Sequence, residues 1–139
     1  MGNQPKFKLI DIVLLECSFK RNASIDFQTY NEAKNNLHLN VEKQLFDTQI
    51  QVVLTSDISI DYEQVIYVES KISIAARFEK VGEITEQLVD NFCNISAPAI
   101  IFPFIREAIA SISVKAGIPT ILIQPINFVE IANKKTEMQ

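Results

Sequence analysis

The stretch of sequence that decides the fold is residues 96–119, "SAPAIIFPFIREAIASISVKAGIP". Its apolar residues recur at steps of three or four, as they do on one face of an α-helix. The repeating positions are Ile101, Ile105, Ile109, Ile112 and Ala116. Lys115 and Gly117 predict the end of the helix, through a favourable charge and a left-handed cap. Because Pro103 lacks an amide hydrogen, we expect residues 98–102 to form a separate turn and the helix to run over residues 103–116.

This helix is apolar around more than half of its circumference. One sheet can cover only one side of a helix, and the opposite side of a surface helix is normally polar. Here part of the opposite side is apolar as well. The excess predicts either a subunit interface or a binding groove.

The first 80 residues alternate apolar and polar residues, which is typical of strands with one covered face. Four strands are expected, and the residues 61–64 predict a tight connection that makes the last two a hairpin. Residues 20–36 are polar and predict a long loop. The four apolar sets are Phe7, Leu9, Val13, Leu15, Cys17 and Phe19; Leu37, Leu39 and Val41; Ile50, Val52, Leu54, Ile58, Ile60 and Tyr62; and Ile66, Val68, Ile72, Ile74 and Phe78.

Three shorter segments complete the predicted fold. Thr85 is placed to cap a short helix that ends at Asn91 or Phe92. Residues 118–127 are expected to be extended, and residues 128–135 to form a second short helix. Strands followed by helices predict an α+β class, with residues 1–139 as a single domain and the long helix over the apolar face of the sheet.

Composition narrows the class of protein. The net charge is −4, from 13 basic and 17 acidic residues, which argues against non-specific nucleic-acid binding. No run approaches the roughly 18 apolar residues that a membrane span needs, so no membrane insertion is expected. The N-terminus shows no signal peptide, and Cys17 and Cys93 are expected to be reduced, so the predicted localisation is cytoplasmic.

No catalytic constellation is visible. His38 is the single histidine, and with two separated cysteines it does not make a usual zinc site. Three glycines are too few for a phosphate-cradling loop. We therefore expect no enzyme, no metal and no cofactor, and the pattern indicates a binding protein. Phe102, Phe104 and Phe128 are expected either in the core or in an apolar groove where helix and sheet meet.

Residues 97–128 resemble the most characteristic stretch of the SecB family of export chaperones. Three motifs match that family in order and spacing: Ile101-Phe102-Pro103-Phe104-Ile105-Arg106-Glu107, Gly117-Ile118-Pro119 and Pro125-Ile126-Asn127-Phe128. The stretches "ECSFK", "LHLNV" and "YVES" are similar more loosely, so the resemblance covers almost the whole chain.

The resemblance implies a four-stranded antiparallel sheet with two C-terminal helices packed on one side. It implies a homotetramer, a dimer of dimers, in which the long helices pack at the tetramer interface. It also implies an ATP-independent holdase that binds unfolded preproteins in apolar grooves and passes them to the SecA motor ATPase.

The resemblance also assigns roles to residues. It places peptide-binding positions at Leu37, Leu39 and Val41 on the short alternating strand and at Phe128 and Ile131 on the final helix. Phe102 and Phe104 are added to this set by the groove alternative above.

For the partner-docking surface, the resemblance implies Glu16 and Glu69. Lys20 and Arg21 stand where the family pattern has an acidic residue and then a small residue or proline. We expect these two basic groups to weaken the attraction to a basic partner segment.

Two alternatives to an export chaperone stay open. A SecB-like protein can guard a single client such as an antitoxin, and Lys20 and Arg21 favour that alternative over export. A chain whose apolar helix serves only as a subunit interface would instead be a structural subunit that binds no client.

Overall fold

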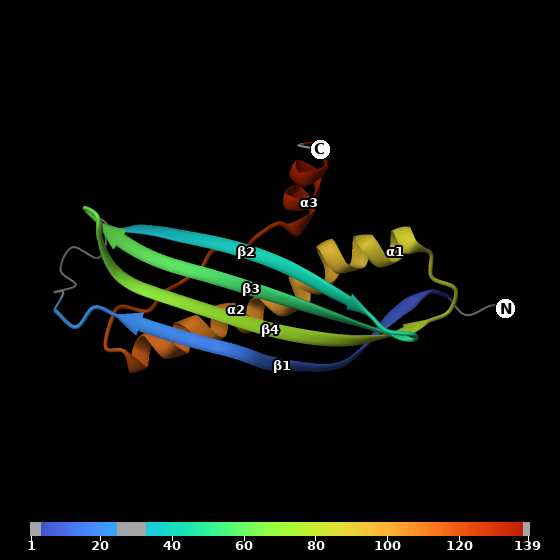
Figure 1. Cartoon of the computed structure of the whole chain (residues 1–139), viewed down its shortest axis with the longest axis horizontal. Helices are drawn as coiled ribbons and strands as arrows, with labels where there is room; N and C mark the ends of the chain where they lie inside the picture. Colours follow the sequence, from blue (N-terminus) through green and yellow to red (C-terminus); the bar gives the residue numbers. More distant parts are fainter. Residues whose placement is uncertain (1–3, 25–32, 138–139) are drawn as a thin grey trace.

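The computed structural model describes residues 4–24 and 33–137. Four antiparallel strands form one sheet in the order β1-β4-β3-β2, and the helices follow them in the chain (Figure 1). The strands are β1 (Lys6–Arg21), β2 (Lys34–Leu45), β3 (Gln49–Tyr62) and β4 (Val65–Val81). The helices are α1 (Glu86–Asn91), the π-helical turn η2 (Phe92–Ser96), α2 (Ala97–Lys115) and α3 (Phe128–Glu137). The predicted α+β class is confirmed.

Strands β3 and β4 form the predicted hairpin. Glu63 and Gln64 connect them, and both have positive φ angles, 49° and 67°, as the central residues of a type I′ turn do. The even-numbered residues of both strands point toward the helix side, and most of them are buried, from Ile50 to Ile60 and from Val68 to Phe78. These two central strands supply most of the sheet's part of the core.

Strand β1 departs from the predicted alternation. Its pairing with β4 shifts between Leu9 and Asp11 and again between Leu14 and Glu16. Each shift inserts one extra residue, a β-bulge, which reverses which side chains face the helix. Val13 therefore lies opposite Ala75 on the outer face, and Leu14 takes a place on the helix side. The prediction that Val13 shares a face with Phe7 and Cys17 was wrong, because a period of two does not anticipate bulges, and Leu15 is the extra residue at the second shift.

Strand β2 follows the prediction. Leu37, Leu39 and Val41 lie opposite Ile58, Ser56 and Leu54, so all three point to the helix side of the sheet. The loop expected over residues 20–36 is shorter at both ends, since β1 extends to Arg21 and β2 begins at Lys34. Residues 25–32 of that predicted loop lie outside the described residues.

Helix α2 covers the helix side of the sheet, and in Figure 1 it runs along β4 and β3. Ile101, Ile105 and Ile109 are fully buried against them. The prediction of a separate turn over residues 98–102 was wrong. The helix begins at Ala97 and contains Pro103.

The π-helical turn η2 explains this continuity. The Thr85 side chain caps α1 by accepting a hydrogen bond from the Leu88 amide, and η2 then joins α1 directly to α2. The Ala97 amide bonds to the carbonyl of Phe92, five residues earlier, a wide turn that leads into Pro98. Pro103 removes one bond of the helix ladder, and the burial of Ile101 and Ile105 on the sheet holds the helix together around it.

Two contacts fix the C-terminal end of α2. The Arg21 guanidinium donates to the Ala116 carbonyl over 2.9 Å. The buried Ser113 hydroxyl donates to the Ala110 carbonyl and accepts from the Ile121 amide. Gly117 has a φ of +70° and ends the helix as predicted. The extended segment 118–127 leads from there back along the sheet to α3.

The continuous helix Glu86–Lys115 is long and apolar enough, by length and composition alone, to cross a membrane. The sequence expectation that no segment comes near that length was therefore too strong. The core helix of a soluble protein can have the same length and composition. Here one face of the helix, with Ile101, Ile105 and Ile109, is buried against the sheet.

Candidate binding groove

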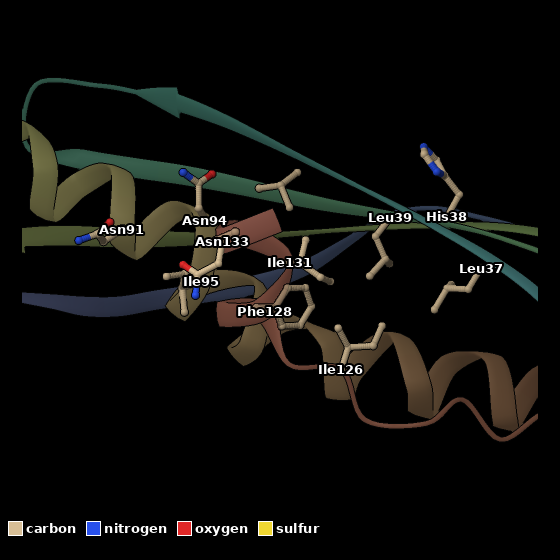
Figure 2. A pocket seen from close by; sticks show the side chains of 12 residues that line it. Leu37, His38, Leu39, Asn91, Asn94, Ile95, Ile126, Phe128, Ile131 and Asn133 are labelled. Carbon is tan, nitrogen blue, oxygen red and sulfur yellow. The ribbon is translucent and has the colours of Figure 1, made fainter. Parts of the chain in front are cut away.

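A hollow of about 580 Å³ lies between β2, the α1–η2 helix and α3 (Figure 2). Its lining comes from three separate parts of the chain, so only the folded protein forms it. The lining residues are Leu37, His38, Leu39, Val41, Asn91, Asn94, Ile95, Ile126, Phe128, Ile131, Ala132 and Asn133. Figure 2 shows Leu37 and Leu39 on one side of the hollow, facing Ile126, Phe128 and Ile131 on the other.

Two neighbouring hollows extend this one into a groove. One of about 240 Å³ lies along residues 121–126 and shares Leu37 and Ile126 with the first. Another, of about 450 Å³, shares Ile95, Ile126 and Phe128 with it. We call these three connected hollows the groove. Because the three hollows follow one another past β2, residues 121–126 and the start of α3, the groove can hold an extended stretch of polypeptide.

The backbone of β2 is available beside the groove. The Phe46 amide donates to the carbonyl of Gln49 over 2.8 Å, and these two residues directly follow the last pair of the β2–β3 register, Leu45 with Ile50. In an antiparallel ladder, hydrogen-bonded and non-hydrogen-bonded pairs alternate. The even-numbered residues of β2 therefore bond to β3, and the odd-numbered residues direct their N–H and C=O groups to the free edge.

Three residues of β2 thus contribute to the groove in two ways, through their side chains and through their backbone. Leu37, Leu39 and Val41 place apolar side chains in it and direct backbone hydrogen-bonding groups toward its open side. Strand β2 is the last strand of the sheet, and across residues 4–24 and 33–137 no other strand pairs with this edge. An extended chain could add there as a fifth strand.

Helix α3 forms the opposite wall. The Asn127 side chain caps it by accepting from the amides of Val129 and Glu130, at 3.0 and 3.3 Å. Phe128 is 5 % exposed and meets Phe102 edge-to-face. Ile131, one turn further, is half-buried beside it. The cap and the aromatic contact together hold α3 in place across the groove from β2.

The structure brings together five of the seven predicted peptide-binding residues, namely Leu37, Leu39, Val41, Phe128 and Ile131. Phe102 is 3 % exposed and lies behind Phe128 in the core, so it supports the groove wall and does not line the groove. Phe104 is 49 % exposed and lines none of the three hollows. The two residues are about half a helical turn apart and therefore lie on different sides of α2, a difference that the sequence pattern alone did not show.

Sequence reasoning missed part of the lining. Ile126 lies inside the Pro-Ile-Asn-Phe motif, whose spacing could have identified it. Asn91, Asn94 and Ile95 come from the α1–η2 helix, and Asn133 from α3. Nothing in their local sequence signals that the two helices meet, because this contact depends on the path of residues 116–127.

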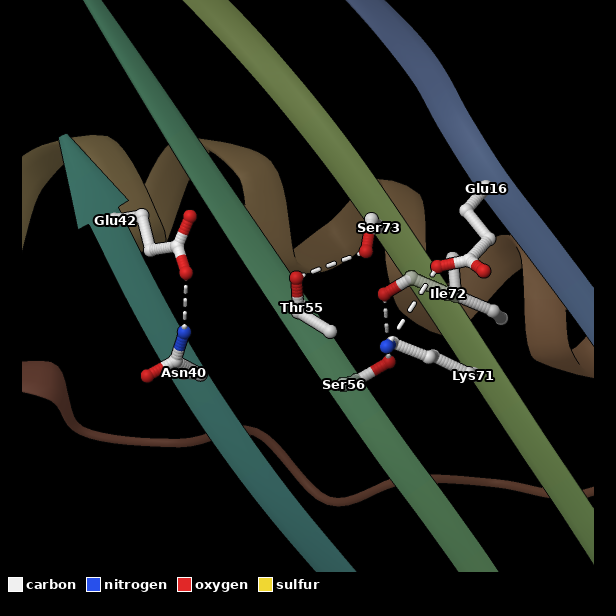
Figure 3. A network of polar contacts seen from close by, with 8 residues as sticks. All are labelled: Glu16, Asn40, Glu42, Thr55, Ser56, Lys71, Ile72 and Ser73. Carbon is white, nitrogen blue, oxygen red and sulfur yellow. Dashed lines mark hydrogen bonds and ion pairs between the residues drawn. The ribbon is translucent and has the colours of Figure 1, made fainter. Parts of the chain in front are cut away.

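The predicted docking residues Glu16 and Glu69 lie on the outer face of the sheet, away from the helices. Glu16 Oε1 is 3.8 Å from the Lys71 ammonium, and beside this pair the Thr55 and Ser73 hydroxyls hydrogen-bond to each other. Figure 3 draws both contacts. Lys20 lies directly opposite Glu69 in the register. A hollow of about 510 Å³ on this part of the sheet includes Lys20, Glu69 and Lys71 in its lining.

The expectation that Arg21 lies beside this surface was wrong. Arg21 is opposite Val68, on the helix side, and its guanidinium bonds to the end of α2. The alternation of a strand sends neighbouring side chains to opposite faces. Of the two basic residues, only Lys20 faces outward.

Asp11, Arg77 and Cys93 have pKa values that are shifted by their surroundings. A two-bond contact with Arg77 lowers the pKa of the Asp11 carboxyl, chiefly through the hydrogen bonds, and raises the pKa of Arg77. Burial raises the pKa of the Cys93 thiol, which keeps it protonated. Among the described residues no three metal-binding side chains come together.

The family model described as preprotein translocase subunit SecB matches residues 1–139. The chain belongs to the SecB family. A protein-export protein SecB of Hahella chejuensis is 34% identical over 130 residues, which cover 90% of this chain and 79% of that protein. One from Marinobacter nauticus is 31% identical over 133 residues, covering 91% of this chain and 77% of the relative. Membership of the SecB family makes the chain a chaperone for protein export.

A solved structure supports the fold. It is a SecB-like chaperone of Mycobacterium tuberculosis in complex with a peptide from an antitoxin. The two chains superpose with a TM-score of 0.76 at 14% identity, over 87% of this chain and 91% of the other. At that identity the likeness establishes the SecB-like fold, and the antitoxin peptide is a property of the mycobacterial protein.

Proposed function

We propose that this SecB-family chain is an ATP-independent holdase that binds unfolded preproteins in the groove and keeps them extended. The observation that carries the proposal is the double use of Leu37, Leu39 and Val41. Their side chains offer apolar contact across from Phe128 and Ile131, and their backbone groups face the open edge of β2.

This combination suits many different clients. Apolar contact is non-directional, and each buried Å² contributes about 25 cal/mol whatever the sequence. Backbone hydrogen bonds to a strand edge are equally independent of sequence. Selectivity for unfolded chains follows, because a folded protein rarely offers a long extended segment whose apolar side chains and backbone groups are both free to bind. No step in this binding needs a nucleotide.

We further propose that the chain works in the cytoplasm as a single-domain protomer of a homotetramer. Exposed apolar side chains remain on α2, at Ile100, Phe104 and Val114. A second group lies along the edge strand β1 and includes residues from both faces of the sheet: Leu9, Ile10, Val13, Leu14 and Leu15. Two such surfaces on one protomer support two different interfaces, as a dimer of dimers requires. The measurement is sedimentation of the wild type and of Phe104→Asp, for which a smaller assembly is expected.

Delivery to the SecA motor ATPase is proposed through the outer face of the sheet. Glu16 and Glu69 are exposed there, and the names of the relatives support a role in export. Lys20, opposite Glu69, reduces the negative charge of this face. That observation favours a second candidate, a chaperone dedicated to one client such as an antitoxin. Co-purification with SecA, compared with a single small client, separates the two.

The groove is tested by suppression of aggregation of a chemically denatured reporter protein, without ATP. Leu39→Asp and Ile131→Asp place charges in the groove at half-buried positions, where the chain can still fold. The matched control is Leu45→Asp, on the same strand but at a position that lines none of the three hollows.

We expect the wild type and Leu45→Asp to suppress aggregation, and both groove variants to lose at least about 90 % of that activity, as an unpaired charge against a bound apolar chain would cause. Equal suppression by all four proteins contradicts the groove assignment. No suppression by the wild type supports the structural-subunit alternative.

A further inference from the structure

Three asparagines gather at one end of the groove. Asn91 and Asn94 come from the α1–η2 helix and Asn133 from α3. Figure 2 shows them at the end away from Leu37, with Leu39, Ile126 and Phe128 between. The two ends of the groove therefore differ in polarity. We call the three side chains the amide end.

The amides of this end are not used inside the fold. All three asparagines are exposed, and within the part of the chain that the structure describes no hydrogen bond involves their side chains. Each amide carries two donors and an acceptor with two lone pairs. In the free protein water satisfies these groups, and a bound client would remove some of that water.

The class of client residue that fits here follows from this desolvation. An apolar side chain placed over the amides would leave them without partners, which costs free energy. An uncharged polar side chain, or a turn of client backbone, would replace the lost water bonds. A charged client residue would need a counter-ion. The nearest ion pair, Lys43 with Asp90, is already matched between β2 and α1.

The ion pair also places a limit on the groove. Lys43 stands two residues beyond Val41 on β2, and Asp90 immediately precedes Asn91. Their contact ties the strand to the helix beyond the amide end. A client segment can continue along the apolar hollows toward residues 121–126, but in the other direction it meets a polar, bridged end.

We propose that the groove selects a boundary in the client, where a run of apolar residues meets a short run of uncharged polar residues. The apolar run lies over Leu37, Leu39 and Phe128, and the polar run lies over Asn91, Asn94 and Asn133. This inference rests on the proposed function, because it specifies the substrate class of the same groove. The client is then expected to bind in one register, because a shift of a few residues along the groove would place apolar side chains on the amides.

The test measures the affinity of two fluorescent peptides by anisotropy. One is apolar throughout. The other has the same length and charge, but one end of its apolar run is replaced by Asn, Ser and Gln; versions with the replacement at either end are both measured. The tighter of the two is compared with the apolar peptide, and the ratio of their dissociation constants is the readout.

The variant is Asn94→Leu with Asn133→Leu, which keeps side-chain size while removing the amides. We expect the ratio to shift about tenfold toward the apolar peptide, as the loss of one to three net hydrogen bonds predicts. Asn94→Ser with Asn133→Ser retains hydrogen bonding and should keep most of the preference. The matched control is Asn40→Leu, on the outer face of β2, which should leave the ratio unchanged.

A ratio that stays within twofold in the leucine variant overturns the inference, while binding of both peptides would leave the proposed function standing. If the wild type binds none of the peptides, the proposed function fails and the inference fails with it. Because all three asparagines are exposed, the variants are expected to fold, which circular dichroism confirms before the affinities are compared.

Discussion

The rings of Phe102 and Phe128 meet edge-to-face, with their centroids 5.7 Å apart and their planes at 77°. Phe102 belongs to the core helix α2, and Phe128 begins the helix that forms one wall of the groove. This contact is the physical link between the packing of the core and the shape of the binding site. A change at Phe102 should therefore act on both.

Phe102→Ala should lower the free energy of unfolding by about 3–5 kcal/mol, as removal of a buried aromatic ring does. The milder Phe102→Leu should keep the fold and weaken client binding, because Phe128 loses its neighbour. Phe104→Leu, on the exposed side of α2, is the control. Denaturant titration and peptide anisotropy measure the two effects. Equal peptide affinity for both leucine variants would contradict the claim that the packing of Phe102 controls the shape of the groove.

Pro103→Ala should raise the free energy of unfolding by about 1–3 kcal/mol. Pro103 lies inside a continuous helix, where proline costs about 3 kcal/mol relative to alanine. A helix that started at Pro103 would gain nothing from this change, since proline is favourable in a first turn. Urea unfolding monitored by circular dichroism distinguishes the two cases, and a neutral or destabilising result would argue for the separate turn.

The Asp11–Arg77 pair predicts a specific dependence of stability on pH. The pKa of Asp11 is lowered from its ordinary value of 3.8 by the Arg77 hydrogen bonds. The carboxylate is thus favoured in the folded state. Its contribution is complete above the unfolded-state pKa of about 4 and is lost as the pH falls through the lower folded-state value.

Unfolding measured between pH 7 and pH 2 should show a smaller acid-induced loss for Asp11→Asn than for the wild type. Direct titration of the Asp11 carboxyl carbon by NMR gives an independent check. A folded-state pKa at or above the ordinary value would contradict the contact with Arg77.

Lys20 and Arg21 should behave differently although they are adjacent. Arg21→Met removes the bond to the Ala116 carbonyl and should cost about 1–3 kcal/mol of stability, with no change in SecA binding. Lys20→Gln should change stability by less than about 0.5 kcal/mol. If Glu16 and Glu69 dock SecA, Lys20→Gln should tighten SecA binding about two- to fivefold, as expected for one exposed ion pair. Titration of each variant with SecA provides the comparison.

The sequence predicted the order of the elements because each carries its own period. The strands β2 and β3 alternate without interruption, and Thr85 and Gly117 are local signals that need no tertiary context. The predictions that failed are those for which contacts between distant parts of the chain override a local sequence pattern. The bulges of β1 reversed the face of Val13, and packing on the sheet carried α2 through Pro103.

The candidate site was predictable to the extent that its residues lie on regular elements. Leu37, Leu39 and Val41 could be grouped by alternation alone, whereas Phe128 and Ile131 came from the family resemblance. Asn94 and Asn133 could not be paired from sequence, because the distance between them depends on how residues 116–127 cross the sheet. Phe102 and Phe104 differ in burial because of helix orientation, which periodicity leaves undetermined in so apolar a helix.

The central claim is that a client binds as an extended chain along the edge of β2, and residue-resolved amide hydrogen exchange tests it most directly. In the free protein the amides of Leu37, Leu39 and Val41 face the open edge and should exchange quickly, while those of Asn36, His38 and Asn40 are bonded to β3. Addition of an apolar client peptide should slow exchange at Leu37, Leu39 and Val41. Unchanged exchange at these three amides with saturating peptide, or protection confined to β1, would contradict the account.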